Sequence, residues 1–476
     1  MNMDDLDFGN MDDEQDDINR NSENIEDEIK KLSQKLNEGS NDLSTIEALE
    51  EVVNYYFENQ KYNEALHFIN RLIELLPISA DAWLRKGTIL NHLQRFQEAL
   101  DCFERAKNLN PYDLELLIGY GFALDNLGKS TEAIQWYDKA LEMDPTNEEA
   151  NFMKALSFEK IHRFTEAIKI FNSILENNPN HKDALYELGY CYDCLNQPEM
   201  ALKYYNLHID LDPFNYNAWY NRGIVLNRMT EFTKAIESYD IAIAIKDDFT
   251  AAWYNKGNTY ANMGKIFDAI DCYKETIKRD THDVPAWHNL GNAYEEIGMF
   301  KEAIKCFTQA IKNDPTHYES LYNRGNCYDY LKDYQKAYND FSRALEMCND
   351  DPELWLAKAD AAYNLGKWRE ALYSYKMAVR WDPKNYYAWF DLGETLFEYG
   401  YFREALKAFN KCIDLEPSWA DPYYDKAKVL FLMRKTYDAI DALKISFILD
   451  PSKIKVFEEE FPGVHSLKEF TDLLEK

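Results

Sequence analysis

The sequence predicts an all-α fold built as a solenoid, an array of one helical unit repeated along the chain. The first observation is a strict period of 34 residues: the segment Trp253–Asn258 (WYNKGN) returns as Trp287–Asn292 (WHNLGN). The second is that twelve units of this length follow one another from Ile46 to Lys453 without insertion or deletion. The third is that no segment has the alternating pattern of a strand. A fixed period of this size indicates stacked supersecondary units that share one continuous core.

Two positions of the unit, counted from Ile46 as position 1, hold small residues. Position 20 is alanine in all twelve units, and position 8 is glycine or alanine in eleven, with Val53 as the exception. Small residues twelve apart indicate two closely approaching helices, because larger side chains would push the axes apart. We therefore expect one helix over positions 1–14 and a second over positions 15–28, with positions 8 and 20 facing each other.

Proline at position 32 closes nine of the twelve units. Proline ends the second helix and restricts the residue before it to extended conformations. Asp247, Thr281 and Asn349 replace it in three units, so those turns are expected to have a weaker stop.

These residues resemble the tetratricopeptide repeat (TPR) family, whose pattern is W-x2-L/R-G-x2-Y, followed by A-x3-F/Y, A and P. The resemblance covers 408 of the 476 residues. It implies stacked antiparallel helix pairs wound into a right-handed superhelix, with the first helix of each pair lining a concave groove.

Three segments flank the array or lead into it. Residues 1–21 carry eight acidic and few apolar residues, which predicts a disordered tail that is either solubilising or an acidic-apolar motif docking on a basic groove. Residues 22–45 are expected to form a short amphipathic helix and a linker, with the helix either capping the first repeat or free for a partner. The array, residues 46–453, begins after the capping-box pattern that starts at Ser44. Residues 454–476 predict C-terminal capping helices, with a partner-binding helix as the alternative.

The formal charge of −31 limits the class of partner. Such a field disfavours nucleic acid and anionic membranes, and it favours basic protein segments. The chain has no secretory signal and no apolar run long enough to span a bilayer, so a soluble cytoplasmic protein is expected. The eight cysteines fit a reducing compartment, because several share repeat position 10 or 23 and are expected to be small packing residues.

No motif in the sequence predicts catalysis, a metal site or a cofactor. Cys191 and Cys194 form a lone Cys-x-x-Cys, and no second ligand pair completes a zinc site. Phosphate-cradling glycine loops and His-Glu-x-x-His are absent from the sequence. The sequence therefore predicts a protein that is not an enzyme.

The family's groove-lining positions point to a peptide-binding site. In the family these are positions 2, 5, 6, 9, 12 and 13, and in the central repeats three of them carry amides and tyrosines. The predicted peptide-binding residues are Asn221, Asn255, Asn289 and Asn323 at position 6, Asn258, Asn292 and Asn326 at position 9, and Tyr220, Tyr254 and Tyr322 at position 5. An amide offers both a donor and an acceptor to a peptide backbone, and tyrosines add apolar area. The pattern resembles the asparagine ladder of O-linked N-acetylglucosamine transferases, whose catalytic part is absent here. The alternative is that these are ordinary repeat residues that bind no ligand.

Position 2 excludes one function known in the family. TPR domains that clamp the acidic C-terminus of heat-shock chaperones rely on basic residues along this helix, and none of the twelve residues at position 2 is basic. We therefore predict a non-enzymatic adaptor whose groove binds an extended, neutral-to-basic protein segment. Two alternatives stay open: a scaffold that uses its convex face and acidic N-terminal tail, and a self-associating subunit.

Overall fold

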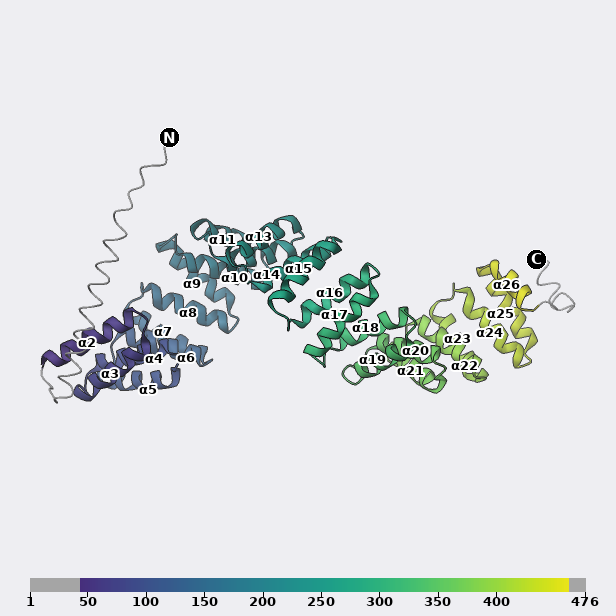
Figure 1. The fold of residues 1–476 in the computed structure, drawn as a ribbon, viewed down its shortest axis with the longest axis horizontal. Helices are drawn as coiled ribbons and strands as arrows, with labels where there is room; N and C mark the ends of the chain where they lie inside the picture. Colours follow the sequence, from purple (N-terminus) through teal and green to yellow (C-terminus); the bar gives the residue numbers. More distant parts are fainter. Residues whose placement is uncertain (1–42, 462–476) are drawn as a thin grey trace, which may run out of the picture. The chain divides into compact units, whose positions relative to one another are not determined.

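The computed structural model describes residues 43–461, and every regular element in this part is an α-helix (Figure 1). The predicted all-α solenoid of paired helices is confirmed. The chain forms two compact units, Met1–Glu231 and Phe232–Lys476. The predicted tail 1–21, most of the predicted segment 22–45 and the last predicted helix lie outside the described residues. No helix in residues 43–461 is long and apolar enough to cross a membrane.

The helices alternate between the first and the second helix of a repeat. The first unit contains α2 (Leu43–Glu58), α3 (Tyr62–Leu75), α4 (Ala80–His92), α5 (Phe96–Leu109), α6 (Leu114–Asn126), α7 (Ser130–Met143), α8 (Glu148–Lys160), α9 (Phe164–Asn177), α10 (Lys182–Cys194), α11 (Pro198–Leu211) and α12 (Tyr216–Arg228). The second unit contains α13 (Phe232–Ile245), α14 (Thr250–Asn262), α15 (Ile266–Arg279), α16 (Val284–Glu296), α17 (Phe300–Asn313), α18 (Tyr318–Tyr330), α19 (Tyr334–Leu345), α20 (Pro352–Asn364), α21 (Trp368–Trp381), α22 (Tyr386–Glu398), α23 (Phe402–Leu415), α24 (Ala420–Leu432), α25 (Thr436–Leu449) and α26 (Ser452–Glu460).

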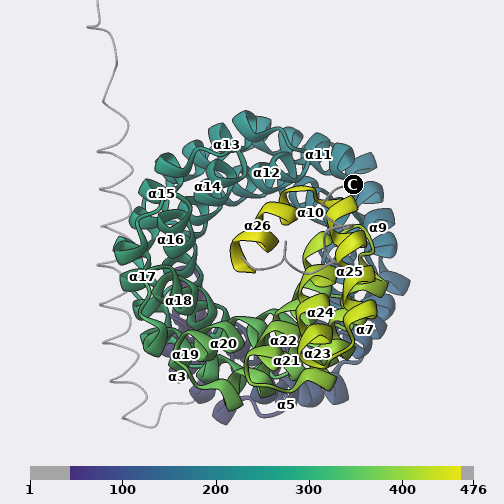
Figure 2. The ribbon, with the colours of Figure 1, turned by 90° about the vertical axis from the view of Figure 1, so that its right-hand side faces the viewer.

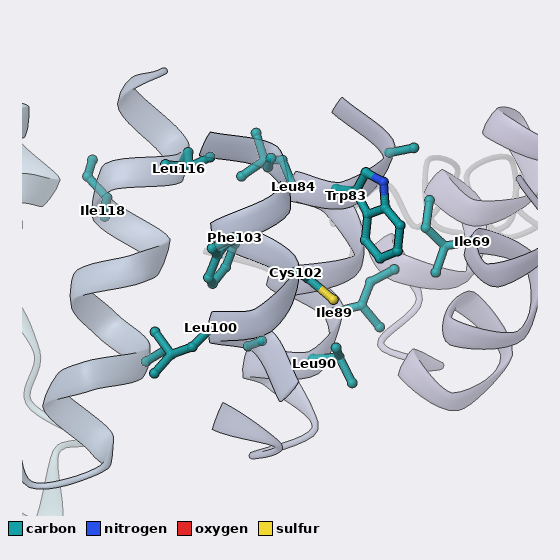
Figure 3. Packing of buried hydrophobic residues seen from close by; sticks show 14 of the residues in the cluster. Ile69, Trp83, Leu84, Ile89, Leu90, Leu100, Cys102, Phe103, Leu116 and Ile118 are labelled. Carbon is teal, nitrogen blue, oxygen red and sulfur yellow. The ribbon is translucent and has the colours of Figure 1, made fainter. Parts of the chain in front are cut away.

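Even-numbered and odd-numbered helices lie on opposite faces of the array. In the second unit, α14, α16, α18 and α20 lie on the inner side of its curve and α15, α17 and α19 on the outer side (Figure 2). We call the surface of the first helices the inner face and that of the second helices the outer face. The core continues from repeat to repeat: Ile69, Trp83, Phe103 and Leu116 belong to three consecutive repeats and to one buried cluster (Figure 3).

The second helix begins two residues later than predicted. The helices occupy positions 1–13 and 17–30, as in Ala80–His92 and Phe96–Leu109. Between them, Gln94 at position 15 has φ 58°. Arg95 N–H donates to the Leu90 carbonyl at 2.9 Å and Gln94 N–H to the Asn91 carbonyl at 3.0 Å, which is a Schellman turn. The left-handed residue recurs at position 15 in all twelve repeats, although only five of these residues are glycine.

The glycine at position 8 lies against the aromatic ring at position 24, rather than against the alanine at position 20 as predicted. A Cβ added to Gly291 would lie 2.5 Å from Phe307 Cε1, and one added to Gly325 would lie 2.5 Å from Phe341 Cε1. The small residue therefore makes room for a ring from the second helix of its own repeat. Ala303, at position 20 of the same repeat, is fully buried.

Two of the three turns that lack proline at position 32 are held by a side chain of the next repeat. The Asp247 carbonyl accepts from Arg279 Nε at 2.7 Å, and the Thr281 carbonyl accepts from Asn313 Nδ2 at 2.9 Å. Arg279 and Asn313 both occupy position 30, and α13 and α15 end at the usual position. In the third such turn, the next repeat has Trp381 at position 30, and the preceding helix α19 ends at Leu345, two residues early. The expected weak stop is thus observed in one of the three turns.

The ends of the array differ slightly from the prediction. The first helix, α2, begins at Leu43, so the predicted start at residue 46 is three residues late and Ser44 lies inside the first turn. After the last repeat, α26 runs from Ser452 to Glu460, and its Phe457 is buried against Phe447. The helix α26 thus begins two residues before the segment, residues 454–476, in which C-terminal capping helices were predicted.

Replacing Gly291 with alanine is expected to destabilise the array by about 1–2 kcal/mol, because the Phe307 ring must move. We expect a value near the lower limit of this range, because Ala155 and Ala359 show that position 8 can hold an alanine in other repeats. Thermal unfolding followed by circular dichroism measures the effect, with Lys301→Ala on an exposed turn of α17 as the control. An unchanged midpoint for Gly291→Ala would show that the ring contact does not set the spacing.

Thr230 is the β-branched residue among the left-handed position-15 residues, with φ 62°. The left-handed conformation strains L residues, so Thr230→Gly is expected to stabilise the chain by about 0.5–1 kcal/mol after the entropy cost of glycine. The reciprocal change Gly298→Thr, at φ 76°, should destabilise it. Denaturant unfolding of both variants tests the pair, and shifts of the same sign would refute the explanation.

Candidate functional site

The ten predicted peptide-binding residues all lie on first helices and therefore on the inner face. Tyr220 and Asn221 belong to α12 in the first unit. The remaining eight belong to α14, α16 and α18 in the second unit, where the structure joins several of them directly.

The asparagines of the second unit form hydrogen bonds from repeat to repeat. Asn289 Nδ2 donates to Tyr254 OH and to Asn258 Oδ1, both at 3.0 Å. Asn323 Nδ2 donates to Asn292 Oδ1 at 2.8 Å. Position 6 of one repeat is therefore bonded to position 9 of the repeat before it.

In the first unit, Asn221 Nδ2 donates to Tyr186 OH at 2.9 Å, again toward the preceding repeat. The amide hydrogens thus connect repeats, and in Asn289 both are used. In Asn221, Asn289 and Asn323 the amide donors are thus directed to the preceding repeat, while the predicted binding of a peptide by this ladder stays a prediction. The side-chain oxygens at position 6 are the groups suited to accept from a ligand N–H.

The tyrosines at position 5 pack within their own repeats. The ring of Tyr254 lies 6.1 Å from that of Tyr273, and the ring of Tyr322 lies 6.0 Å from that of Phe341. Tyr254 and Tyr322 are half-buried, so part of the apolar area predicted for a ligand is used by the core. Sequence reasoning missed Tyr273, whose hydroxyl donates to Asn258 Oδ1 at 2.8 Å.

A hollow of 280 Å³ lies beside this network. Its lining includes three of the predicted residues, Asn258, Asn289 and Asn292, together with Tyr273 and Glu296. Ala261, Ile266 and Ala293 supply the apolar part of the lining.

Further along the inner face of the second unit, the same two positions carry carboxylates instead of amides. Asp360 is at position 9 of α20, and Asp391 is at position 6 of α22. Burial, with the charges of Asp360 and Glu394, raises the pKa of Asp391 to about 7. Burial raises the pKa of Asp360 to about 6, although Tyr375 OH donates to Asp360 Oδ1 at 2.6 Å. No basic side chain in residues 43–461 forms an ion pair with either carboxylate.

The next repeat continues this acidic line. Glu394 and Asp425 occupy the corresponding positions on α22 and α24, and burial followed by the charge of Asp425 raises the pKa of Glu394. Here a cation is present: Lys428 Nζ lies 2.8 Å from Asp425 Oδ1 and 3.7 Å from Glu460 Oε2. We call Asp360, Asp391, Glu394 and Asp425 the acidic line. Its signal in the sequence was visible: four of the six residues at positions 6 and 9 of the last three repeats are acidic, and the other two are Ala357 and Lys428.

The first unit contains a larger hollow, of 680 Å³, on its own inner face. Its lining residues come from α4, the turn after it, the first residue of α5, α6 and α8: Thr88, Asn91, His92, Gln94, Phe96, Glu115, Ile118, Gly119, Phe122, Asn126, Glu149 and Met153. Asn91 Nδ2 donates to the Gly119 carbonyl at 3.0 Å, while the buried Asn91 Oδ1 has no partner among the described residues. Sequence reasoning missed this hollow. Its signal was Gly119, the single glycine at position 6 of the array.

An acidic pair adds to the inner face of the first unit. Burial, together with the charge of Glu187, raises the pKa of Glu159. Burial, together with the charge of Asp183, raises the pKa of Glu187. Each unit thus presents carboxyl groups that are harder to ionise than ordinary surface acids.

Most of the cysteines are packed in the core. Six of the eight are buried, and all are free thiols. Cys191 is fully buried and Cys194 is exposed, and burial raises the pKa of both thiols. Residues 43–461 contain no group of three or more His, Cys, Asp or Glu side chains placed to hold a metal ion.

Family comparisons agree with this architecture. Three models of the tetratricopeptide repeat match the chain. The first matches residues 80–113, 284–317 and 318–351, the second matches residues 356–443, and the third matches residues 250–283. The chain is a tetratricopeptide repeat protein. Two other models match parts of the TPR array: anaphase-promoting complex, cyclosome, subunit 3 over residues 126–206, and the protein prenyltransferase alpha subunit repeat over 198–229. The TPR repeats indicate a scaffold for protein–protein interaction, and the matches indicate no catalytic family.

Solved TPR structures are similar to parts or most of the array. One is MamA, with 28% identity over 34% of this chain and 94% of that chain and a TM-score of 0.33. YrrB is described as a TPR protein with an unusual peptide-binding site. It has 21% identity, the match covers 38% of this chain and 92% of that chain, and the TM-score is 0.36. A chain of the APC/C hetero-tetramer Cut9-Hcn1 has 15% identity. The match covers 91% of this chain and 96% of that chain, and the TM-score is 0.38. No curated protein matches the chain significantly.

The acidic line predicts that the TPR array loses stability as pH rises. The folded pKa values of Asp360 and Asp391, about 6 and about 7, lie above their ordinary value, so the folded state retains protons that the unfolded chain has released. Stability is therefore highest at low pH within the window from about 4 to 7 and falls as pH rises through it. Replacing both residues with asparagine should raise the midpoint temperature of unfolding at pH 8 by roughly 2–4 °C. At pH 5 the same replacement should leave that midpoint nearly unchanged.

Differential scanning calorimetry at both pH values measures this effect. Asp271→Asn with Asp441→Asn, two exposed acids of the second unit, is the matched control for the change in charge. Equal shifts at pH 5 and pH 8, or equal shifts in the control, would contradict it.

Proposed function

We propose that the inner face binds an extended, neutral-to-basic segment of a partner protein. The observation that carries the proposal is the acidic line: half-buried Asp360 and Asp391 have no basic partner in residues 43–461, and the charge of Asp360 contributes to the raised pKa of Asp391. A lysine or arginine side chain placed there would lower both pKa values and remove the repulsion. The chain's formal charge of −31 attracts the same class of segment from a distance.

The asparagine hollow supports an extended peptide at the neighbouring repeats. The amides of Asn289 and Asn323 at position 6 donate to the oxygens of Asn258 and Asn292 at position 9, which leaves the position-6 oxygens to accept from a ligand. These oxygens can accept hydrogen bonds from the N–H groups of a peptide backbone. Such bonds do not depend on which side chains the peptide has. The neutral stretch would thus position the segment, and the acidic stretch would select its charge.

The affinity is expected to be moderate. Each neutral hydrogen bond contributes about 1 kcal/mol net, and ordering a long peptide offsets much of the total. Charge-assisted contacts are stronger, so the acidic line should account for most of the discrimination.

A selection experiment on the full chain tests the proposal. Unstructured peptides of sixteen residues are displayed and selected against the chain, and the affinity of the most enriched sequence is measured by fluorescence anisotropy at pH 8. We expect enriched peptides to carry net positive charge. Asp360→Asn with Asp391→Asn should weaken binding about tenfold, the loss of roughly 1.5 kcal/mol from charged hydrogen bonds.

The control pair Asp271→Asn and Asp441→Asn removes the same charge elsewhere in the second unit and should leave the affinity within twofold. Enrichment of acidic or uncharged apolar peptides would refute the proposal, as would equal losses in the two double variants. Circular dichroism of each variant separates a loss of binding from a loss of fold.

A further inference from the structure

Position 2 of α22 differs from position 2 of every other repeat. It holds Tyr387, where the other repeats have an acid, Asn217, Ala251 or Pro285. Tyr387 is 56% exposed on the inner face of the second unit. A ring that is exposed to this extent adds little to the core, so the packing of the repeat does not explain its presence.

A second exception lies beside it, in the turn before α24. Trp419 occupies position 34, the N-cap of that helix, and its side chain forms no capping hydrogen bond. In the two preceding repeats, Asp351 and Asn385 at this position accept hydrogen bonds from the first turn of the helix. The loss of such a cap destabilises a helix, so Trp419 is not explained by the needs of the fold. Its indole N–H donates to Asp421 Oδ2 at 2.6 Å, which fixes the orientation of the ring.

The two rings belong to one aromatic cluster that extends from the core to the surface. Phe390 lies against the buried Phe409, with ring centres 5.9 Å apart, and Trp419 lies 4.5 Å from Phe390. The ring of Tyr387 lies 5.3 Å from that of Trp419 at an angle of 62°. Tyr386 flanks these two rings at 4.3 and 5.7 Å. We call Tyr387, Phe390 and Trp419 the aromatic corner. Because its rings are held by the core, a ligand would meet them already in position.

The aromatic corner adjoins the acidic line. Asp391 follows Phe390 directly and lies one helical turn after Tyr387, so the carboxylate and the ring are neighbours on the surface of α22. Within residues 43–461, no Lys or Arg side chain lies over the three rings. Elsewhere in the second unit a cation of the chain occupies such a place, since Arg279 Cζ lies 4.9 Å from the centre of the Trp253 ring.

We propose that the aromatic corner and Asp391 form a site for an arginine side chain of the bound protein segment. The inference rests on the proposed function and narrows it, from a basic segment to one with an arginine at this repeat. A planar guanidinium can stack on an aromatic face while its N–H groups donate to a carboxylate. The compact ammonium of lysine has no flat surface to stack. The aromatic corner would therefore select arginine over lysine, whereas the acidic line attracts both.

The first test uses three fluorescein-labelled peptides of sixteen residues, built from Gly and Ser with four arginines, four lysines or four trimethyllysines. Their affinities for the full chain are measured by fluorescence anisotropy at pH 8. The arginine peptide should bind roughly three- to fivefold more tightly than the lysine peptide. The double change Tyr387→Asn and Trp419→Asn should remove that preference and leave the affinity for the lysine peptide within twofold. The fold should tolerate it, because Asn217 and Asn385 occupy the same two positions in other repeats.

Two control variants separate this inference from the proposed function. Phe267→Asn with Tyr437→Asn removes rings that are 72% and 82% exposed on second helices, and it should leave the preference for arginine unchanged. Asp360→Asn with Asp391→Asn should weaken the binding of both the arginine and the lysine peptide.

Equal affinities of the unaltered chain for the arginine and lysine peptides would overturn the arginine site and leave the proposed function intact. Tighter binding of the trimethyllysine peptide, or a preference for arginine that survives Tyr387→Asn with Trp419→Asn, would have the same consequence. Failure of all three peptides to bind more tightly than an uncharged Gly–Ser peptide would contradict the proposed function itself.

The second test follows the ring of Trp419 directly, by fluorine NMR of the full chain labelled with 5-fluorotryptophan. The Trp419 signal is identified by its loss in Trp419→Asn, and the signal of Trp368, on the outer-face helix α21, by its loss in Trp368→Phe. Saturation with the arginine peptide should shift the Trp419 signal, leave the Trp368 signal in place and exceed the shift caused by the lysine peptide. A Trp419 signal that does not move at saturation, or equal shifts of the two signals, would overturn the arginine site.

Discussion

The contact between a small residue at position 8 and an aromatic ring at position 24 sets the geometry on which the rest of the array depends. A Cβ at Gly291 would come within 2.5 Å of Phe307, so the two helices of that repeat are as close as their side chains allow. The same contact recurs in the next repeat between Gly325 and Phe341, so these repeats share one internal packing. Positions 6 and 9 therefore recur at equivalent places on the first helices, whatever residues occupy them.

At these equivalent places, amides and carboxylates have opposite effects on the stability of the array. In repeats seven to nine, asparagines at positions 9 and 6 share hydrogen bonds, as Asn292 and Asn323 do at 2.8 Å. In repeats ten to twelve, the equivalent places hold Asp360 and Asp391, whose charges repel. The first pair stabilises the stack of repeats, and the second reduces its stability at neutral pH in favour of a surface that attracts cations. Equivalent positions thus form a joint between repeats in one stretch and the proposed binding surface in the other.

The sequence was sufficient for the fold because the period, the small residues and the prolines all describe one unit. It was less informative where contacts join different repeats. Position 8 was assigned to alanine at position 20, because spacing alone cannot show that a ring from position 24 fills the gap. The amides of Asn289 were expected to face a ligand, yet they bond to Tyr254 and Asn258, which are 35 and 31 residues away. Gly119 opens a hollow that no motif marks, since its effect depends on neighbours from three helices.

In the proposed function, the carboxyl groups of the acidic line would couple the binding of a partner to the release of protons. A group with a pKa near 7 is partly protonated in a neutral solution, and a bound lysine or arginine would expel that proton. The second unit would then exchange hydrogen ions for cationic side chains, much as a weak-acid ion exchanger does. Its grip on a basic segment would loosen whenever the surroundings acidify, without any movement of the helices.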